Sequence, residues 1–160
     1  DISRRASDHA SLAASVRAAE ALDRRLKKIE EENEALRKEV DALKRVLPQR
    51  FSVSLSKCFE ELDDKGKWTS EKFSLAGLQG LWLEFWPSGD SKGKPAGKCS
   101  LYLCSPKDLA ARVSLTVDDV TRTSPGVEKI DAGGGRGYPE FAEAKQSYTT
   151  ATVEILQVDW

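Results

Sequence analysis

Few residues of this chain are of the types that do chemistry. The sequence holds three cysteines, Cys58, Cys99 and Cys104, and one histidine, His9. In a strand, Cys99 and Cys104 would point to opposite faces, which suits neither a disulfide nor a shared metal ion. We expect all three cysteines to be small apolar fillers in a reducing compartment, the cytoplasm. One histidine gives little basis for a zinc site or a catalytic pair, so no metal and no cofactor is expected.

Carboxylates and glycine-rich loops are the other groups that could suggest catalysis. Neighbouring carboxylates occur at Glu60–Glu61, Asp63–Asp64 and Asp118–Asp119. They lie beside predicted turns, and adjacent residues of a strand face opposite ways, so a general acid–base pair is not supported. The loops DSKGKPAGK (90–98) and DAGGGRG (131–137) lack the strand-to-helix context and the GK[ST] ending of a nucleotide site. We interpret them as a hairpin connection and a surface loop, and we expect no enzyme activity.

Charge and hydropathy exclude several classes of partner. Lys plus Arg number 25 and Asp plus Glu 26, so no net field draws the chain to nucleic acid or to an anionic membrane. No apolar run approaches the roughly 18 residues of a membrane span, and the first residues lack the apolar core of a signal peptide. The sequence has no methionine, even at its first position, which we interpret as the mark of a piece of a longer chain.

A change in composition divides the sequence into two parts. Residues 1–47 contain neither Gly nor Pro, whereas residues 48–160 hold all 11 glycines and all 6 prolines. Pro48 marks the boundary, because proline disfavours helix in the residue before it and has no N–H to donate. The sequence therefore predicts a helix over 1–47 and a second domain over 48–160.

The predicted helix repeats its apolar residues with heptad spacing from about residue 19, which is typical of a coiled coil. Position a is occupied by Leu26, Asn33, Val40 and Leu47, and position d by Leu22, Ile29, Leu36 and Leu43. Ser15 falls at a d position, so the Ala-rich start is predicted to fray. A helix that packs on its own second domain would need a wider apolar stripe. We therefore predict that the stripe associates with copies of itself.

Charges beside the stripe favour a parallel association in register. The residues that would face each other between chains are Arg25 with Glu30, Glu32 with Arg37, and Glu39 with Lys44. All three pairs are opposite in sign, and such exposed pairs set orientation more than they add stability.

The residues at positions a and d favour different numbers of chains in the assembly. Val40 at a with Leu43 at d, and Asn33 at a, favour a dimer, whereas Leu26 at a with Ile29 at d favours more strands. The stretch RLKKIE (25–30) resembles the Arg-h-x-x-h-Glu pattern of three-stranded coils. We predict a parallel homotrimer and keep the dimer as the alternative.

After Arg50 the apolar period changes to two. Alternating runs occupy residues 50–56, 81–86 and 113–117, and further strands are predicted at 100–103 and 152–158. Such runs predict antiparallel strands with one buried face. The predicted fold class is α plus all-β, a parallel coiled-coil helix followed by an antiparallel sandwich of seven or eight strands. A short helical turn is expected in EFAEAK (140–145).

Several strings, in this order and spacing, resemble the TRAF domain, which joins a coiled coil to a MATH (TRAF-C) sandwich. They are TSEKFSLAG, LWLEFWPSGDSKGKPAGKCSLYL, GYPEF and AEAKQSY, followed by the closing strand. The resemblance covers the chain from about Arg50 to its end. One departure is that Thr149 and Thr150 replace the acidic residues that the family has after the Ser-Tyr.

The resemblance implies a trimer in which each sandwich binds a short extended peptide along an exposed sheet edge, with affinity gained through multivalency. The family's groove residues fall on Glu84, Trp86, Asp90, Tyr102, Arg122, Thr123, Ser124 and Arg136. Glu84 stands where the family has an arginine, and Arg122 and Arg136 stand where it has serines. The peptide is therefore expected to differ in charge from the family's usual motif.

The expected function is that of an oligomeric scaffold or adaptor that binds a partner protein through an extended peptide. Two alternatives remain on the sequence alone. One is a purely structural component of a cytoskeletal or organelle scaffold, and the other is the substrate-recognition part of a ubiquitin ligase whose catalytic module lies upstream.

Overall fold

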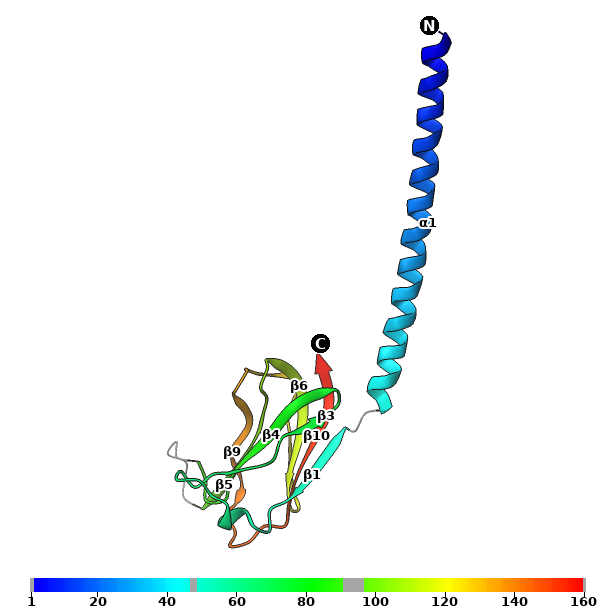
Figure 1. The fold of residues 1–160 in the computed structure, drawn as a ribbon. Coiled ribbons are helices and arrows are strands. Elements are labelled where there is room, and N and C mark those ends of the chain that lie inside the picture. The colour runs from blue at the N-terminus through cyan, green and yellow to red at the C-terminus, as the bar shows by residue number, and fades with distance from the viewer. Residues whose placement is uncertain (1, 47–48, 91–96, 160) are drawn as a thin grey trace. The chain divides into compact units, whose positions relative to one another are not determined.

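The structure, a computed structural model, describes residues 2–46, 49–90 and 97–159. The chain divides into two compact units, Asp1–Val46 and Leu47–Trp160, and each is described by itself below (Figure 1).

The first unit is a single helix, α1 (Ile2–Val46). The Ala-rich start, which was predicted to be a fraying helix, forms part of α1. Alanine has the highest helix propensity, which favours a helix here although Ser15 stands at a d position. Leu47 and the side chain of Lys44, both assigned above to the association, lie outside the described residues and side chains.

The second unit is built almost entirely of strands. They are β1 (Arg50–Ser54), β2 (Trp68–Thr69), β3 (Phe73–Leu75), β4 (Leu78–Trp86), β5 (Lys98–Cys104), β6 (Leu109–Val117), β7 (Val120–Thr123), β8 (Glu128–Ile130), β9 (Gly135–Glu143) and β10 (Thr150–Asp159). One short 3₁₀ helix, η1 (Cys58–Glu60), follows β1.

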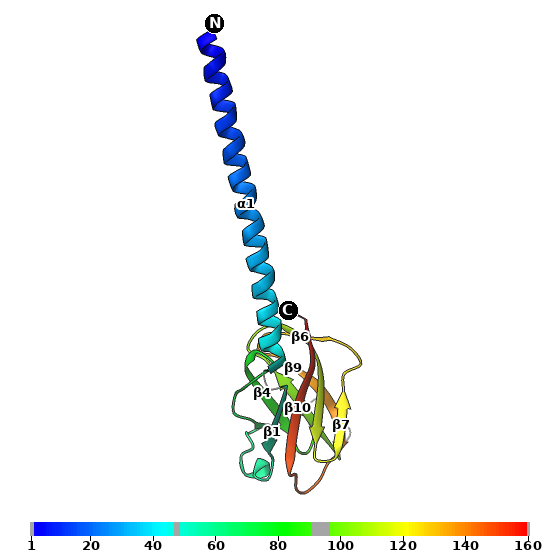
Figure 2. The same ribbon diagram turned by 90° about the vertical axis from the view of Figure 1, so that its right-hand side faces the viewer.

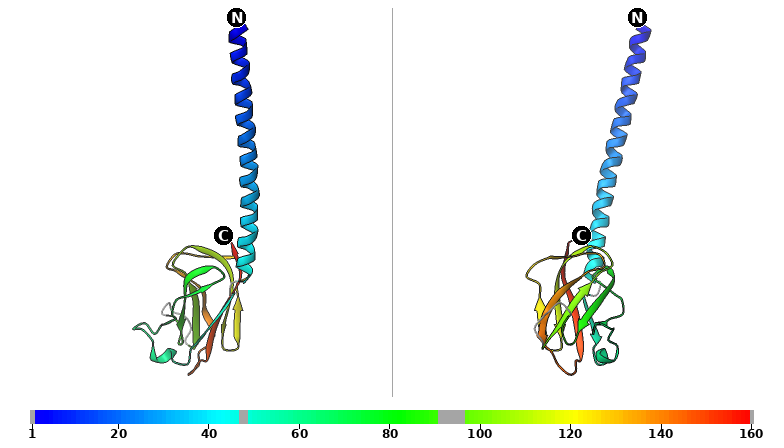
Figure 3. Two further views of the ribbon diagram at one scale, coloured as in Figure 1. Left: turned by 45° about the vertical axis from the view of Figure 1, so that its right-hand side comes forward. Right: turned by 90° about the vertical axis from the view of Figure 1, so that its left-hand side faces the viewer.

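The strands form two five-stranded antiparallel sheets. The first has the order β1–β10–β6–β7, with β8 also paired to β6, and the second has the order β2–β4–β5–β9, with β3 also paired to β4. Figures 2 and 3 show the two sheets lying face to face as the layers of a sandwich. At the ends of the two sheet orders, β1, β7, β2 and β9 each pair with one strand only.

This architecture corrects the predicted fold class. The described residues form one α-helix and ten strands, so the chain is mostly β rather than a coiled coil followed by a sandwich of seven or eight strands. The strands that the prediction did not count are short: β2, β3, β7 and β8 have two to four residues each. Such short strands offer no alternation to detect, and they form because longer neighbours provide a hydrogen-bonding edge.

The core lies between the sheets and comes from the inward-facing residues of the long strands. Leu81, Leu83 and Phe85 of β4 are fully buried, as are Leu101 and Leu103 of β5. The period-two runs of the sequence therefore identified β1, β4, β5, β6 and β10 correctly. The cysteines were also assigned correctly as buried, since Cys58, Cys99 and Cys104 are all free and buried.

The short helical turn expected in EFAEAK is wrong. This segment continues β9 to Glu143, because Ala142 and Glu143 pair with Cys99 and Lys98 of β5. Pairing with a neighbouring strand outweighs the helical propensity of six residues. Within the described residues, no helix is long and apolar enough to cross a membrane.

Candidate functional site

The helix carries an apolar stripe that nothing in its own unit covers. At the predicted contact positions from residue 22 onward, the exposed fraction of the large apolar side chains ranges from 47% (Val40) to 61% (Leu43). The described members of this stripe are Leu22, Leu26, Ile29, Leu36, Val40 and Leu43. Two further exposed apolar residues, Leu12 and Val16, extend the apolar surface toward the start of the helix.

Charged residues on the helix make ion pairs along its surface. Lys28 pairs with Glu32 at 3.8 Å and Lys38 with Glu34 at 2.9 Å, each between residues four apart. These pairs are exposed and add only a few tenths of a kcal/mol (about 0.3–0.5). The charged residues assigned to contacts between chains, Arg25, Glu30, Glu32, Arg37 and Glu39, are likewise exposed.

Half of the predicted groove residues meet on the outer face of the second sheet. Glu84 and Trp86 alternate with the buried residues of β4, and Glu84 lies directly opposite Tyr102 of β5. The rings of Trp86 and Tyr102 meet edge to face with centroids 5.4 Å apart. The hydroxyl of Tyr102 donates to the carboxylate of Asp90 at 2.6 Å. We call Trp86, Tyr102 and Asp90 the aromatic cluster.

Burial and the hydrogen bond with Asp90 both raise the pKa of Tyr102. The phenol therefore stays protonated and keeps donating to the carboxylate at any physiological pH. The backbone N–H of Asp90 also donates to the hydroxyl of Ser100 at 3.2 Å. These bonds fix the cluster on β5 and on the segment that follows β4.

Beside this cluster, β4 presents two tryptophans separated by a carboxylate. The indole N–H of Trp82 donates to Glu84 at 3.2 Å, and the ammonium of Lys67 pairs with the same carboxylate oxygen at 3.1 Å. Lys67 also lies 5.6 Å from the ring centroid of Trp86, and Lys72 lies 5.9 Å from that of Trp82. We call Trp82, Glu84 and Trp86 the tryptophan strip.

The other predicted groove residues lie elsewhere. Arg122 of β7 donates from Nε to the carbonyl of Phe141 in β9 at 3.1 Å, and Arg136 of β9 pairs with Glu128 of β8 at 3.4 Å. Ser124 is buried, and its hydroxyl both accepts from the N–H of Val113 at 2.9 Å and donates to the same residue's carbonyl at 3.2 Å. Thr123 bonds to Ser114 at 3.0 Å on the exposed side of the first sheet and is separate from both groups.

A small pocket lies between the sheets beside β9. The space inside it that a water molecule can reach is about 20 Å³. Its lining consists of Ala111, Val113 and Leu115 of β6, Ser124, Glu128 and Ile130, and Arg136, Gly137 and Tyr138 of β9. The walls are mostly apolar, with Ser124, Glu128 and Arg136 as the polar members. Such a pocket has room for about one water molecule, so it is a packing gap and not a recess for a side chain.

Strand β9 separates this pocket from the outer face of the sheet. It is the last strand of its sheet and pairs only with β5. Gly137 lies opposite Tyr102, and a Cβ at this glycine would lie 2.0 Å from the carbonyl oxygen of Leu101. The carbonyl of Pro139 accepts the hydroxyl of Ser100 in β5, so this residue faces β5, and the carbonyl of Phe141 already accepts Arg122 of β7. A peptide that adds to the edge of β9 would therefore pair best with residues 135–138.

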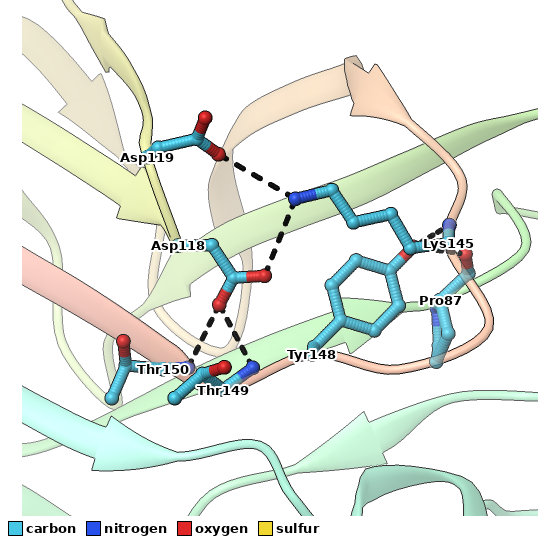
Figure 4. Close-up of polar contacts among 7 residues, drawn as sticks. All are labelled: Pro87, Asp118, Asp119, Lys145, Tyr148, Thr149 and Thr150. Atoms are coloured by element: carbon cyan, nitrogen blue, oxygen red, sulfur yellow. Dashed lines mark hydrogen bonds and ion pairs between the residues drawn. The ribbon is translucent and has the colours of Figure 1, made fainter.

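A second polar network closes the far end of the sandwich. Asp118, in the turn between β6 and β7, accepts the N–H groups of Thr149 and Thr150 at 2.8 and 3.0 Å (Figure 4). The ammonium of Lys145 lies 3.5 Å from both Asp118 and Asp119. The acid that binds the backbone of these two threonines therefore comes from another loop.

Tyr148 anchors the same loop to the core. Its hydroxyl donates to the carbonyl of Pro87 at 2.9 Å and accepts the N–H of Lys145 at 2.8 Å (Figure 4). Burial raises the pKa of Tyr148 to about 12. The group is therefore neutral and structural, and its bonds leave no unpaired donor for a ligand.

Sequence reasoning missed Lys67, Lys72 and most of the pocket lining. Trp82 could have been found, because an outward-facing tryptophan in the alternation LWLEFW is unusual for a solvated strand face. Lys67 gave no signal, since it pairs with Glu84 across 17 positions. Within the described residues, no group of three or more His, Cys, Asp or Glu side chains could hold a metal ion.

Models of known protein families give no match to this chain, and no curated protein sequence matches it significantly.

Proposed function

We propose that the chain is a self-associating adaptor whose sandwich binds an extended peptide of a partner protein. This is the role that the resemblance to TRAF domains implies. The observation that carries the proposal is the apolar stripe of α1, whose large side chains are about half exposed. An apolar stripe of this length is rarely left in water, and association with other copies would bury it.

Charge complementarity favours a second copy as the occupant of the stripe. In a parallel arrangement, Arg25 would face Glu30 and Glu32 would face Arg37, both opposite in sign. Three chains are proposed and two are the alternative. Asn33, the polar residue in the middle of the stripe, would favour one register over others at a cost in stability.

The proposed peptide site lies along β9. An unpaired edge provides main-chain hydrogen bonds, while the aromatic cluster on the outer face of the same sheet would select side chains. A single such site binds weakly. Association of the helices would bring several sites together on one assembly, and effective concentration would then strengthen binding to a clustered partner by about 10²–10⁴-fold.

The cytoplasm is the proposed location. Cys58, Cys99 and Cys104 are unbonded and buried, and thiols of this kind persist in a reducing compartment.

Light scattering of the purified chain tests the association. The trimer predicts about 53 kDa, three times the 17.6 kDa of one chain. A mass near 35 kDa would replace the trimer by the dimer. A mass of 17.6 kDa at micromolar concentration would refute self-association and remove the basis for multivalent binding.

A peptide array probed with the chain tests the binding site. Hits are expected to weaken at least 5-fold with Trp86→Ala and with Tyr102→Ala, because the loss of a buried aromatic contact costs about 1–3 kcal/mol. Thr123→Ala is the matched control, since Thr123 was predicted for the groove but lies on the other sheet. Hits that resist both aromatic substitutions would place binding elsewhere, and an array without hits would favour a purely structural role.

A further inference from the structure

The tryptophan strip contains the elements of a cation-binding site. A carboxylate supplies charge, and the face of a neighbouring tryptophan attracts a cation through the ring quadrupole within about 6 Å. In the strip, Glu84 supplies the carboxylate and Trp86 the ring. The N–H of Trp82, at 3.2 Å from Glu84, holds the carboxylate in place.

The cation now in this site belongs to the chain itself. Lys67 reaches Glu84 at 3.1 Å and lies 5.6 Å from the Trp86 ring centroid, with only 23% of its side chain exposed. Its backbone is held in a tight turn, where its N–H donates to the Asp63 carboxylate at 2.9 Å. Lys67 is therefore a tethered occupant, attached just before the two-residue strand β2.

A second lysine repeats the arrangement on the neighbouring ring. Lys72, which precedes β3, lies 5.9 Å from the ring centroid of Trp82. Both tryptophans of the strip thus have a lysine ammonium near the ring. This repetition indicates that the outer face of β4 favours cations, and that the chain's own flexible side chains occupy it.

We propose that the tryptophan strip binds an arginine or lysine side chain of the partner peptide in place of Lys67. Arginine suits the site better than lysine, because a guanidinium can pair with a carboxylate through two parallel bonds and stack on an indole. The exchange conserves charge at Glu84. It also returns the Lys67 side chain to solvent, where the side chain regains conformational freedom.

An unpaired donor on the same surface supports the exchange. The indole N–H of Trp86 is buried and has no acceptor among the described residues. A buried donor without a partner costs stability. A carbonyl of a bound peptide could supply the missing acceptor.

The inference rests on the proposed function only in taking the occupant to be a peptide. It gives that peptide a chemistry, a basic residue where the family's pattern would pair an acidic one. The site itself requires neither self-association nor strand addition at β9, so it can be tested apart from both.

The test uses N-acetyl-L-argininamide as the probe and its neutral analogue N-acetyl-L-citrullinamide as the control. The readout is the ¹H–¹⁵N shift of the indole groups of Trp82 and Trp86 in the whole chain, assigned with Trp82→Phe and Trp86→Phe. Only the arginine probe is expected to shift these signals saturably. An equal response to citrullinamide would overturn the proposal.

Two substitutions identify the groups involved. Lys67→Gln removes the tethered competitor and is expected to tighten probe binding about 3- to 10-fold, whereas Glu84→Gln is expected to weaken it at least 5-fold. Lys129→Gln is the matched control, because Lys129 makes a similar 3.1 Å ion pair with Asp131 on another part of the surface. An unchanged affinity in Lys67→Gln would overturn the exchange.

The peptide array separates this inference from the proposed function. Hits enriched in arginine or lysine, and strengthened by Lys67→Gln, would support both. Hits without such a preference, together with a silent arginine probe, would overturn the cation site and leave peptide binding intact. A strip that binds the probe while the array stays empty would overturn peptide binding instead.

Discussion

At the scale of single residues, Asp118 shows how one carboxylate can hold two loops. Its Oδ1 accepts two backbone N–H groups, from Thr149 and Thr150, and its φ of 51° lies in the left-handed region. Asparagine tolerates that region better than most residues, so Asp118→Asn removes the charge with little backbone strain. The substitution therefore reports how much the negative charge at this turn contributes to the free energy of unfolding.

We expect Asp118→Asn to lower the free energy of unfolding at pH 7 by about 1 kcal/mol, measured by urea denaturation. Burial acts to raise the pKa of Asp118, but the Thr150 and Thr149 N–H groups and Lys145 outweigh it, so the pKa lies below the ordinary 3.8. A lowered pKa in the folded state stabilises the protein above the ordinary value, and this stability is lost as the pH falls through the folded value.

The stabilities of wild type and Asp118→Asn should therefore converge as the pH falls below 3.8. Asp119→Asn is the control, because Asp119 is exposed and pairs with Lys145 at 3.5 Å. Its loss should cost less than about 0.5 kcal/mol. A difference between wild type and Asp118→Asn that stayed constant down to the lowest pH would contradict the charge-based account.

At the scale of elements, most of the strands that the sequence did not predict are short, and the nine-residue β9 is the exception. Five long strands carry alternating or apolar runs, and these were found. The short strands β2 and β7 hold Trp68–Thr69 and Val120–Thr123, too few residues for a periodic signal. The start of β9 was wrongly interpreted as part of the surface loop 131–137, and its end as a helical turn, since its pairing with β5 depends on residues about 31 to 45 positions away.

The residues of the candidate site also divide into those that the sequence could bring together and those that it could not. Trp86, Asp90 and Tyr102 lie on consecutive elements of one hairpin, and their proximity could be anticipated from strand pairing. Lys67 and the lining of the pocket depend on contacts between distant segments or between sheets. No spacing in a single sequence encodes such contacts, and the tethered lysine was found only from the structure.

The ladder between β5 and β9 gives a prediction at this scale. A Cβ at Gly137 would lie 2.0 Å from the Leu101 carbonyl oxygen and 2.7 Å from the Cα of Tyr102. Both contacts are with backbone atoms, so the strands would have to separate. We expect Gly137→Ala to destabilise the sandwich by about 2 kcal/mol in guanidinium denaturation followed by tryptophan fluorescence.

Gly126→Ala is the matched substitution for this test. Gly126 has an ordinary negative or extended φ and open space where its Cβ would be. Its replacement should change stability by less than about 1 kcal/mol, with a small gain expected from the less flexible unfolded chain. Equal effects of the two substitutions would show that β9 does not pack against β5 as closely as described.

At the scale of the whole molecule, the two units should respond differently to dilution. All four tryptophans, Trp68, Trp82, Trp86 and Trp160, belong to the strand-rich unit, so fluorescence reports that unit alone. Circular dichroism at 222 nm reports mainly α1. A helix stabilised by association should melt at a temperature that rises with protein concentration, whereas the sandwich should not.

The substitution Leu36→Gln tests whether association of the helix and folding of the sandwich are independent. Glutamine keeps the helix propensity of leucine but places a polar group in the stripe, so association should weaken by about 2–3 kcal/mol per chain. The expected result is a loss of mass in light scattering and of signal at 222 nm, with an unchanged fluorescence transition. Glu31→Gln, on the opposite face of α1, should change neither. A fluorescence transition that fell together with the helical one would mean that the units fold as one, and the separate roles proposed for them would not hold.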